Sequence, residues 1–426
     1  MSPSRLPRLA LAAIALLLAR HAWADDDDAN ALMLADQVDS TVAQRSDWRS
    51  FIEGSAGYSH WRNGNNRRDS QRLSLDTQYD HSLSPAWRLF VADRLDIGWP
   101  SQNGNPHGIN TLKEAYLNWR AQPETLLDAG RVNVRNGVAT GYNPTDYFRR
   151  GAVRSPVSIS PASLKENRQG SVMLRGQQLW DGGSLTALYS PELDDRPSSD
   201  GFSLNPGATN YRDRWLLSLS QKISSDYTPQ LLFYQEAGRN AQLGFNLTRL
   251  INDSTVAYLE WSGGRRQPEL AQALQQYQPG CACKAWRNQL ATGATYTSPN
   301  KQSLTVEYHY NGAALDREQW DALRHGYLPA YAQYRNWTAA AQDSPTQQAL
   351  FFYASWQDAL LQHLDANLMH NVDLADHSRR LWFELRYHPG HVDYVIQWQR
   401  NSGEALSHFG AMPEAQSWQA QVRYYF

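Results

Sequence analysis

The sequence predicts an all-β fold, a transmembrane antiparallel β-barrel of about 18 strands, with 16 as the alternative count. Three observations predict it. Apolar and polar residues alternate along most of the chain, the alternating segments have the length of a membrane-crossing strand, and the links between them are alternately short and long. Such a barrel has short periplasmic turns at one rim and long extracellular loops at the other.

The composition narrows the classes of protein that fit. The 426 residues include 16 Trp and 22 Tyr, amphipathic rings that suit a boundary between water and lipid and also a sugar-binding surface. No apolar run of about 18 residues occurs outside the extreme N-terminus, which excludes helical membrane spans. A formal net charge of -2 argues against a nucleic-acid partner, which usually requires a basic excess.

The N-terminal segment has the pattern of an export signal. Arg5 and Arg8 precede an apolar run, and Ala22-Trp23-Ala24 then supplies a small-x-small cleavage site. We therefore expect residues 1–24 to be a signal peptide and residues 25–46, which begin with four Asp, to be a flexible periplasmic leader. The barrel is predicted for residues 47–426.

The strands follow from the alternation, which is clearest in residues 71–80, 303–310 and 381–388. Each of these segments has one apolar and one polar face, as expected of a strand between lipid and water. The expected strands start near Trp48, Arg72, Trp87, Leu112, Thr125, Ser171, Ser184, Arg214, Gln230, Ala241, Ser254, Trp286, Ser303, Gln348, Leu364, Leu381, Val392 and Trp418.

The links between these strands differ in length by position. Even-numbered links are short, and odd-numbered links are mostly long and rich in Gly, Asn, Pro and Arg. The longest are expected at residues 134–169 and 311–345. Within the second, Trp320, Leu323 and Tyr327 have helical spacing, which predicts a short helix over residues 316–327. Packing of that helix against its own loop is preferred over folding into the barrel.

A sheet in lipid must close on itself, because an open edge would leave backbone groups unpaired in hydrocarbon. The polar halves of the strands then line the lumen. About 18 strands leave room for an aqueous path unless loops fill it. The lining is mixed in sign, so its charges either orient charged solutes or form ion pairs that brace the wall. Candidate pore-lining residues are Arg72, Arg94, Glu114, Arg131, Arg175, Arg287, Glu307, Glu384 and Arg386.

One segment supports a family resemblance. Gly130-Arg131 ends a strand, and Gly141-Tyr142-Asn143-Pro144-Thr145-Asp146 follows, with Lys113-Glu114-Ala115-Tyr116-Leu117 on the strand before. Over about residues 87–180 this pattern resembles the alginate-export type of large outer-membrane barrel. The resemblance implies an 18-stranded barrel that passes an anionic polymer through an Arg-rich lumen. The candidate constriction-loop residues are Asn143, Asp146, Arg149 and Arg150.

The last strand carries a specific signal. Trp418, Ala420, Val422, Tyr424 and Phe426 share one face. This pattern resembles the C-terminal strand that the barrel-assembly machinery recognises in outer-membrane proteins, and it marks Tyr424 and Phe426 as an assembly signal.

The cysteines are confined to one predicted extracellular loop. Cys281 and Cys283 are the whole cysteine content, and a disulfide between them is the leading interpretation in an oxidising compartment. Metal binding lacks supporting ligand spacing, and no cofactor is expected.

The sequence thus predicts an outer-membrane channel of a Gram-negative bacterium, a porin or export pore for polar solutes. Its expected partners are outer-membrane lipid, the barrel-assembly machinery and a polar or anionic small solute or oligosaccharide, because the arginine fork suits carboxylates and sugar acids. The alternative is a non-conducting surface barrel that acts as a receptor or assembly scaffold. A barrel hydrolase is least favoured, since no Gly-x-Ser-x-Gly motif accompanies the histidines.

Overall fold

A computed structural model describes residues 46–62, 67–100, 107–155, 157–197, 201–202, 205–224, 226–274 and 284–426. The expected signal peptide, nearly all of the leader, and both Cys281 and Cys283 lie outside these residues, so these expectations stay predictions. No helix within the described ranges is both long and apolar enough to span a membrane.

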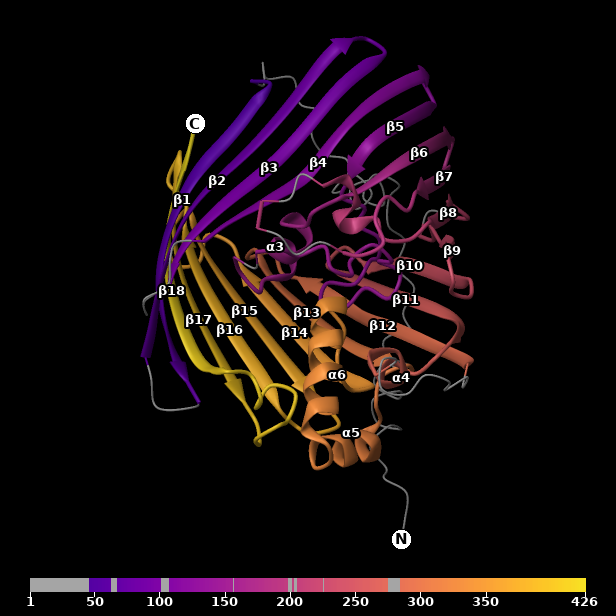
Figure 1. Cartoon of the computed structure of the whole chain (residues 1–426). Helices are drawn as coiled ribbons and strands as arrows, with labels where there is room; N and C mark the ends of the chain where they lie inside the picture. Colours follow the sequence, from indigo (N-terminus) through magenta and orange to yellow (C-terminus); the bar gives the residue numbers. More distant parts are fainter. Residues whose placement is uncertain are drawn as a thin grey trace.

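Eighteen strands form one closed antiparallel sheet in which chain neighbours pair and β18 pairs with β1 (Figure 1). The predicted fold class and strand count are therefore confirmed. The strands are β1(Trp48–Trp61), β2(Arg67–Ser84), β3(Trp87–Pro100), β4(His107–Gln122), β5(Thr125–Val132), β6(Ser171–Trp180), β7(Gly183–Ser190), β8(Arg214–Gln221), β9(Gln230–Glu236), β10(Gln242–Asn252), β11(Thr255–Arg266), β12(Ala285–Thr297), β13(Gln302–Asn311), β14(Gln348–Trp356), β15(Leu364–Asp373), β16(Arg379–Tyr387), β17(Val392–Ser402) and β18(Glu414–Tyr425).

The two faces of the sheet differ as the alternation predicts. On β2, Leu73 and Leu75 are more than 40% exposed on the outer face, whereas Ser74 and Asp76 are buried on the inner face. At the short-turn rim, the outward rings of Trp87 and Trp119 stack with their centroids 5.5 Å apart. An outer apolar belt with aromatic residues at its edge is the surface that a bilayer requires.

The longest loops carry helices and enter the barrel interior. Residues 133–155 and 157–170, the folded-in loop, run inside the ring of strands and contain α3(Pro161–Glu166), which Figure 1 shows near the centre of the barrel. Ser160 caps this helix by accepting the N–H of Ser163 at 3.2 Å. The loop residue Phe148 packs with Met173 and Leu216 of the wall in one buried apolar cluster.

That cluster corrects one expectation. The inner faces of β6 to β9 were expected to be polar, but Leu188, Leu216 and Leu232 point inward and are at most 3% exposed. The physical reason is that the folded-in loop covers this part of the wall with Phe148, so water does not reach it.

The loop between β13 and β14 holds α5(Arg317–Arg324) and α6(Leu328–Ala341), and the one between β11 and β12 begins with α4(Glu269–Ala273). Asp316 starts α5 with a capping box that includes Gln319. The buried Trp320 packs on Tyr331 and Tyr334 of α6. The predicted helix thus packs against its own loop, and it ends at Arg324 rather than at Tyr327.

Candidate solute pathway

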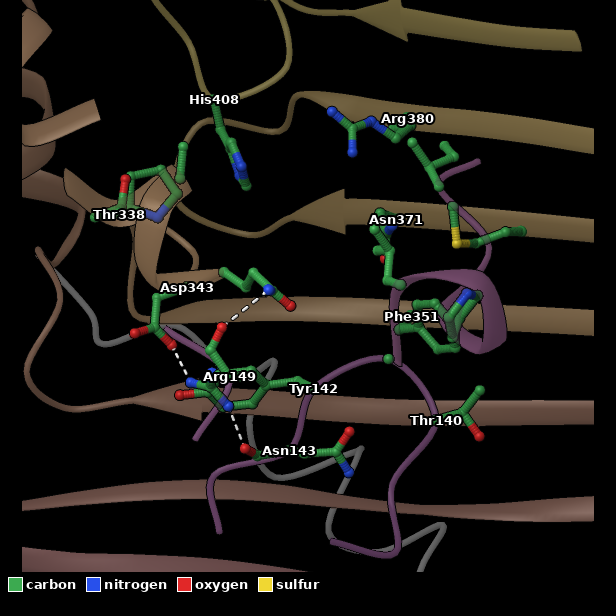
Figure 2. A pocket seen from close by; sticks show the side chains of 18 of the residues that line it. Thr140, Tyr142, Asn143, Arg149, Thr338, Asp343, Phe351, Asn371, Arg380 and His408 are labelled. Carbon is green, nitrogen blue, oxygen red and sulfur yellow. Dashed lines mark hydrogen bonds and ion pairs between the residues drawn. The ribbon is translucent and has the colours of Figure 1, made fainter. Parts of the chain in front are cut away.

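Two cavities lie inside the barrel on either side of the folded-in loop. The larger cavity, of about 330 Å³, is bounded by loop residues Thr140–Arg168, by α6 and by inner residues of β14 to β16 (Figure 2). The smaller cavity, of about 80 Å³, is bounded by the same loop and by inner residues of β8 to β12. The position of the loop therefore determines both spaces.

One wall carboxylate holds the first part of this loop. Glu260, on β11 and fully buried, accepts the backbone N–H groups of Val138 at 2.9 Å, Ala139 at 3.2 Å and Thr145 at 2.8 Å. It also accepts the side-chain amide of Asn143 at 3.0 Å and the hydroxyl of Thr145 at 2.8 Å. Loop N–H groups that would otherwise lack partners in the lumen are satisfied in this way.

A second carboxylate holds the next turn of the loop. Glu307, on β13, accepts the N–H groups of Thr140 at 2.6 Å and Gly141 at 2.9 Å. Its oxygens also contact the hydroxyl of Tyr258 and Nε2 of His309. Glu260 and Glu307 together fix the backbone of residues 138–145 against the wall. This stretch of the loop therefore has a defined position inside the lumen.

Close approach of loop and wall also requires glycine. Gly137 has a φ of +104°, and a Cβ there would lie 2.6 Å from both carboxylate oxygens of Glu260. A Cβ on Gly141 would lie 2.7 Å from the ring of Phe351.

Arg149 separates the two cavities together with Asp343, the second residue beyond α6, and both side chains line both cavities. Figure 2 shows the guanidinium of Arg149 between the carboxylate of Asp343 and the carbonyl oxygen of Asn143, to which it donates hydrogen bonds. Its Nε also donates to the carbonyl of Ala341 at 3.2 Å. Burial disfavours the charged guanidinium, but Asp343, Tyr142 and Asp146 together outweigh that effect and hold the pKa of Arg149 above its ordinary value.

The larger cavity has a surplus of positive charge. Asp343 is the only carboxylate among its described lining residues. Its basic lining residues are Arg149, Lys165, Arg168, Arg335 and Arg380. Nη1 of Arg335 is buried without a hydrogen-bond partner among the described residues, and burial lowers the pKa of both Arg335 and Lys165. The cavity therefore presents cationic groups whose charge the protein compensates only in part.

The smaller cavity has the same character. Its charged lining residues are Arg149, Arg150, Arg214, Arg239, Arg266, Asp146, Glu236 and Asp343. Nε and Nη2 of Arg266 are buried without a hydrogen-bond partner within the described part of the chain. Burial, followed by the charge of Arg239, lowers the pKa of Arg150. Both cavities thus have more basic than acidic side chains on their described lining.

The predicted constriction-loop residues Asn143, Asp146, Arg149 and Arg150 all lie in the folded-in loop. Asn143 and Arg149 line the larger cavity. Asp146, Arg149 and Arg150 line the smaller one. Asp146 also pairs with Arg168 at 2.5 Å, an ion pair that joins an interior residue of the loop to its C-terminal end.

The predicted pore-lining residues are placed differently. They all lie within the described ranges, and none of them lines either cavity. Arg72 and Arg94 converge on the buried Glu53 at 2.8 and 2.9 Å, and Arg423 reaches the same carboxylate at 2.7 Å. These arginines brace the wall where β1, β2, β3 and β18 meet, which is the second of the two roles that the sequence left open.

The remaining candidates on the wall are also engaged. Arg175 pairs with Asp128 at 2.6 Å. Arg386 pairs with Asp393 at 3.2 Å and Glu384 at 3.4 Å. Three others hold loop backbone: Arg131 donates to the carbonyl of Gly170, Arg287 donates to the carbonyl of Gly312, and Glu114 accepts the N–H of Asn133.

Sequence reasoning missed several groups that hold the folded-in loop or line the cavities. Glu260 and Arg266 occupy inward positions of β11, so the alternation restricts them to the lumen but does not single them out. Arg335 and Asp343 belong to a loop whose fold the alternation does not describe. No group of three or more His, Cys, Asp or Glu side chains in the described ranges could hold a metal ion.

Comparisons with known proteins rest on structure. No protein-family profile matches the sequence, and no curated protein matches it. The structure is similar to that of Pseudomonas aeruginosa OccK5 (OpdH), with a TM-score of 0.53 at 10% identity over 89% of this chain and 98% of that one. Acinetobacter baumannii OccAB1 matches with a TM-score of 0.53 at 10% identity, over 89% and 97% of the two chains. Pseudomonas aeruginosa OpdQ matches with a TM-score of 0.53 at 11% identity, over 90% and 99%.

The fold is porin-like. At these identities the similarity shows the fold alone, an 18-stranded barrel of the outer-membrane porin type. It supports the porin-like barrel that the sequence predicts and gives no support to the alginate-export resemblance.

Proposed function

We propose that this protein is a channel in the outer membrane of a Gram-negative bacterium that passes polar solutes and favours small anions. The observation that carries the proposal is the surplus of cationic groups in both cavities of a closed barrel. Similarity to the Pseudomonas and Acinetobacter barrels supports the outer membrane as its location.

The chemistry of the lining supports an anionic solute. The guanidinium groups of Arg335 and Arg266 line the larger and the smaller cavity, and a guanidinium binds a carboxylate through paired, charge-assisted hydrogen bonds. Low-dielectric walls focus the field of these cations and raise the local concentration of anions. A cavity of about 330 Å³ has the size of a small-molecule site. Small carboxylates or short acidic saccharides therefore fit better than a long anionic polymer.

The test is a reversal potential. The purified protein in a planar bilayer under a KCl gradient should prefer chloride to potassium, more strongly at low salt, where screening is weak. Arg335→Gln should reduce this preference. Arg324→Gln is the matched control. Arg324 lies on α5, in the same loop between β13 and β14 as Arg335, and it pairs with Asp321 and Glu404 away from both cavities. A preference for potassium in the wild-type protein would overturn the proposal.

A non-conducting surface barrel is the second candidate. Two observations favour it: the Arg149 and Asp343 side chains separate the cavities, and an apolar cluster fills the lumen beside β6 to β9. Folded protein that inserts into the bilayer and carries no current would establish this alternative.

A further inference from the structure

We propose that Asp343 is a tethered anion at the crossing point between the two cavities, and that a permeating anion passes by taking its place on Arg149. This inference rests on the proposed function. In this proposal, Asp343 sets the affinity of the pathway for anions.

The contacts of Arg149 identify the exchangeable partner. Apart from Asp343, its guanidinium donates hydrogen bonds to the backbone carbonyls of Asn143 and Ala341, which are neutral. A solute carboxylate can replace the Asp343 carboxylate on the same face of the fork without disturbing those two bonds.

The two partners are anchored differently, and this determines which one moves. Arg149 belongs to the loop whose preceding turns Glu260 and Glu307 fix through backbone N–H groups. Asp343 follows the end of α6, where Gln342 adopts a left-handed φ of 55° and the Asp343 N–H bonds to the carbonyl of Thr338 at 3.0 Å. Its carboxylate can swing away about its own side-chain torsions while the backbone stays in place.

The positive charge of the larger cavity explains why competition by Asp343 would help anions to leave. Asp343 is the only carboxylate on its described lining, opposite five basic side chains. Without it, an anion would bind the Arg149 guanidinium with no protein carboxylate in contact with that group to compete. Conduction requires binding that is favourable enough for entry and weak enough for release. By competing for Arg149, Asp343 weakens anion binding enough for release.

The experiment compares Asp343→Asn with the wild-type protein in planar bilayers, with chloride and acetate as the probes. The variant should show a stronger anion preference. Its acetate current should saturate at a concentration lower by about tenfold, the factor expected when one charge-assisted hydrogen bond no longer competes. Asp343→Glu, which keeps a carboxylate, should behave like the wild type.

The matched control is Asp321→Asn, because Asp321 pairs with Arg324 on α5 and lines neither cavity. Asp343→Ser serves as a second neutral variant if the Asn variant does not fold. Unchanged selectivity and saturation in a folded neutral variant of an anion-selective wild type would overturn the role of Asp343 and leave the proposed function standing. A wild type without anion preference would overturn the proposed function itself.

Discussion

At the residue scale, the carboxylate of Glu260 holds the first part of the folded-in loop against the wall. Glu260 accepts five hydrogen bonds, three of them from backbone N–H groups of Val138, Ala139 and Thr145. A carboxylate can do this because both of its oxygens only accept, and each offers two lone pairs. A Gln side chain at position 260 would place its NH₂ group, which only donates, against loop N–H groups that also only donate.

We therefore expect Glu260→Gln to release the loop. Each buried donor left unsatisfied costs about 1–3 kcal/mol, while the barrel wall keeps its own backbone pairing. The variant should fold but show larger and noisier single-channel currents, together with faster hydrogen exchange at residues 138–145. Glu124→Gln, an exposed position on a short turn, is the control. Wild-type currents and exchange in the variant would contradict this role.

Residues of this kind show what the sequence can and cannot predict. Alternation places Arg72, Arg94 and Glu307 on the inner face correctly, because the side-chain period of a strand is two. It does not say which inner residues meet. The partners of Glu53 come from three other strands, including Arg423 at the far end of the chain, and they depend on the register of the closed sheet.

At the scale of elements, strands were predictable and helices much less so. All 18 strands begin within about five residues of the expected positions, since lipid on one side and water or protein on the other enforce the alternation. Helix α6 was missed because Tyr331, Tyr334 and Thr338 are buried in it among other small and aromatic residues, without a clear polar face. The position of α6 depends on packing against α4 and α5, and the local sequence pattern does not predict this packing.

The docking of α4 carries a pH dependence. Glu269 is buried, accepts the side-chain amide of Asn311 at 2.8 Å, and has no partner for Oε2 among the described residues. Burial, followed by repulsion from Asp343, raises its pKa to about 7 from an ordinary value of 4.5. The docked state thus prefers the neutral acid, so its stability is greatest below about pH 4.5 and is lost as the pH rises through 7.

We expect hydrogen exchange in residues 269–273, corrected for intrinsic rates, to accelerate between pH 5 and pH 8. Glu269→Gln should remove this acceleration, because the amide stays neutral at both values. Glu318→Gln, exposed on α5, should retain it. An identical pH profile in Glu269→Gln would show that another group is responsible.

At the scale of the whole molecule, we expect assembly to depend on the C-terminal aromatic residues. Tyr424 and Phe426 point outward and are 50% and 69% exposed, and the N–H of Phe426 bonds to the carbonyl of Ser50 on β1 at 3.0 Å. We expect deletion of Phe426 to lower the yield of folded, heat-modifiable barrel. Phe426→Tyr, which keeps an aromatic ring, should give the same yield as the wild type. Normal yield after the deletion would count against Phe426 as an assembly signal.

The arginine cluster around Glu53 has a consequence for the order of folding. Glu53 lies on the first strand and Arg423 on the last, 370 residues apart in the chain. Until β18 arrives, the sheet has two open edges and Glu53 lacks one of its cations. Such long-range pairing is slow to form, because loop-closure entropy is lost before the contacts are gained. When the ends meet, backbone pairing and this charge cluster complete together, so we expect closure of the ring to be a single cooperative event late in folding.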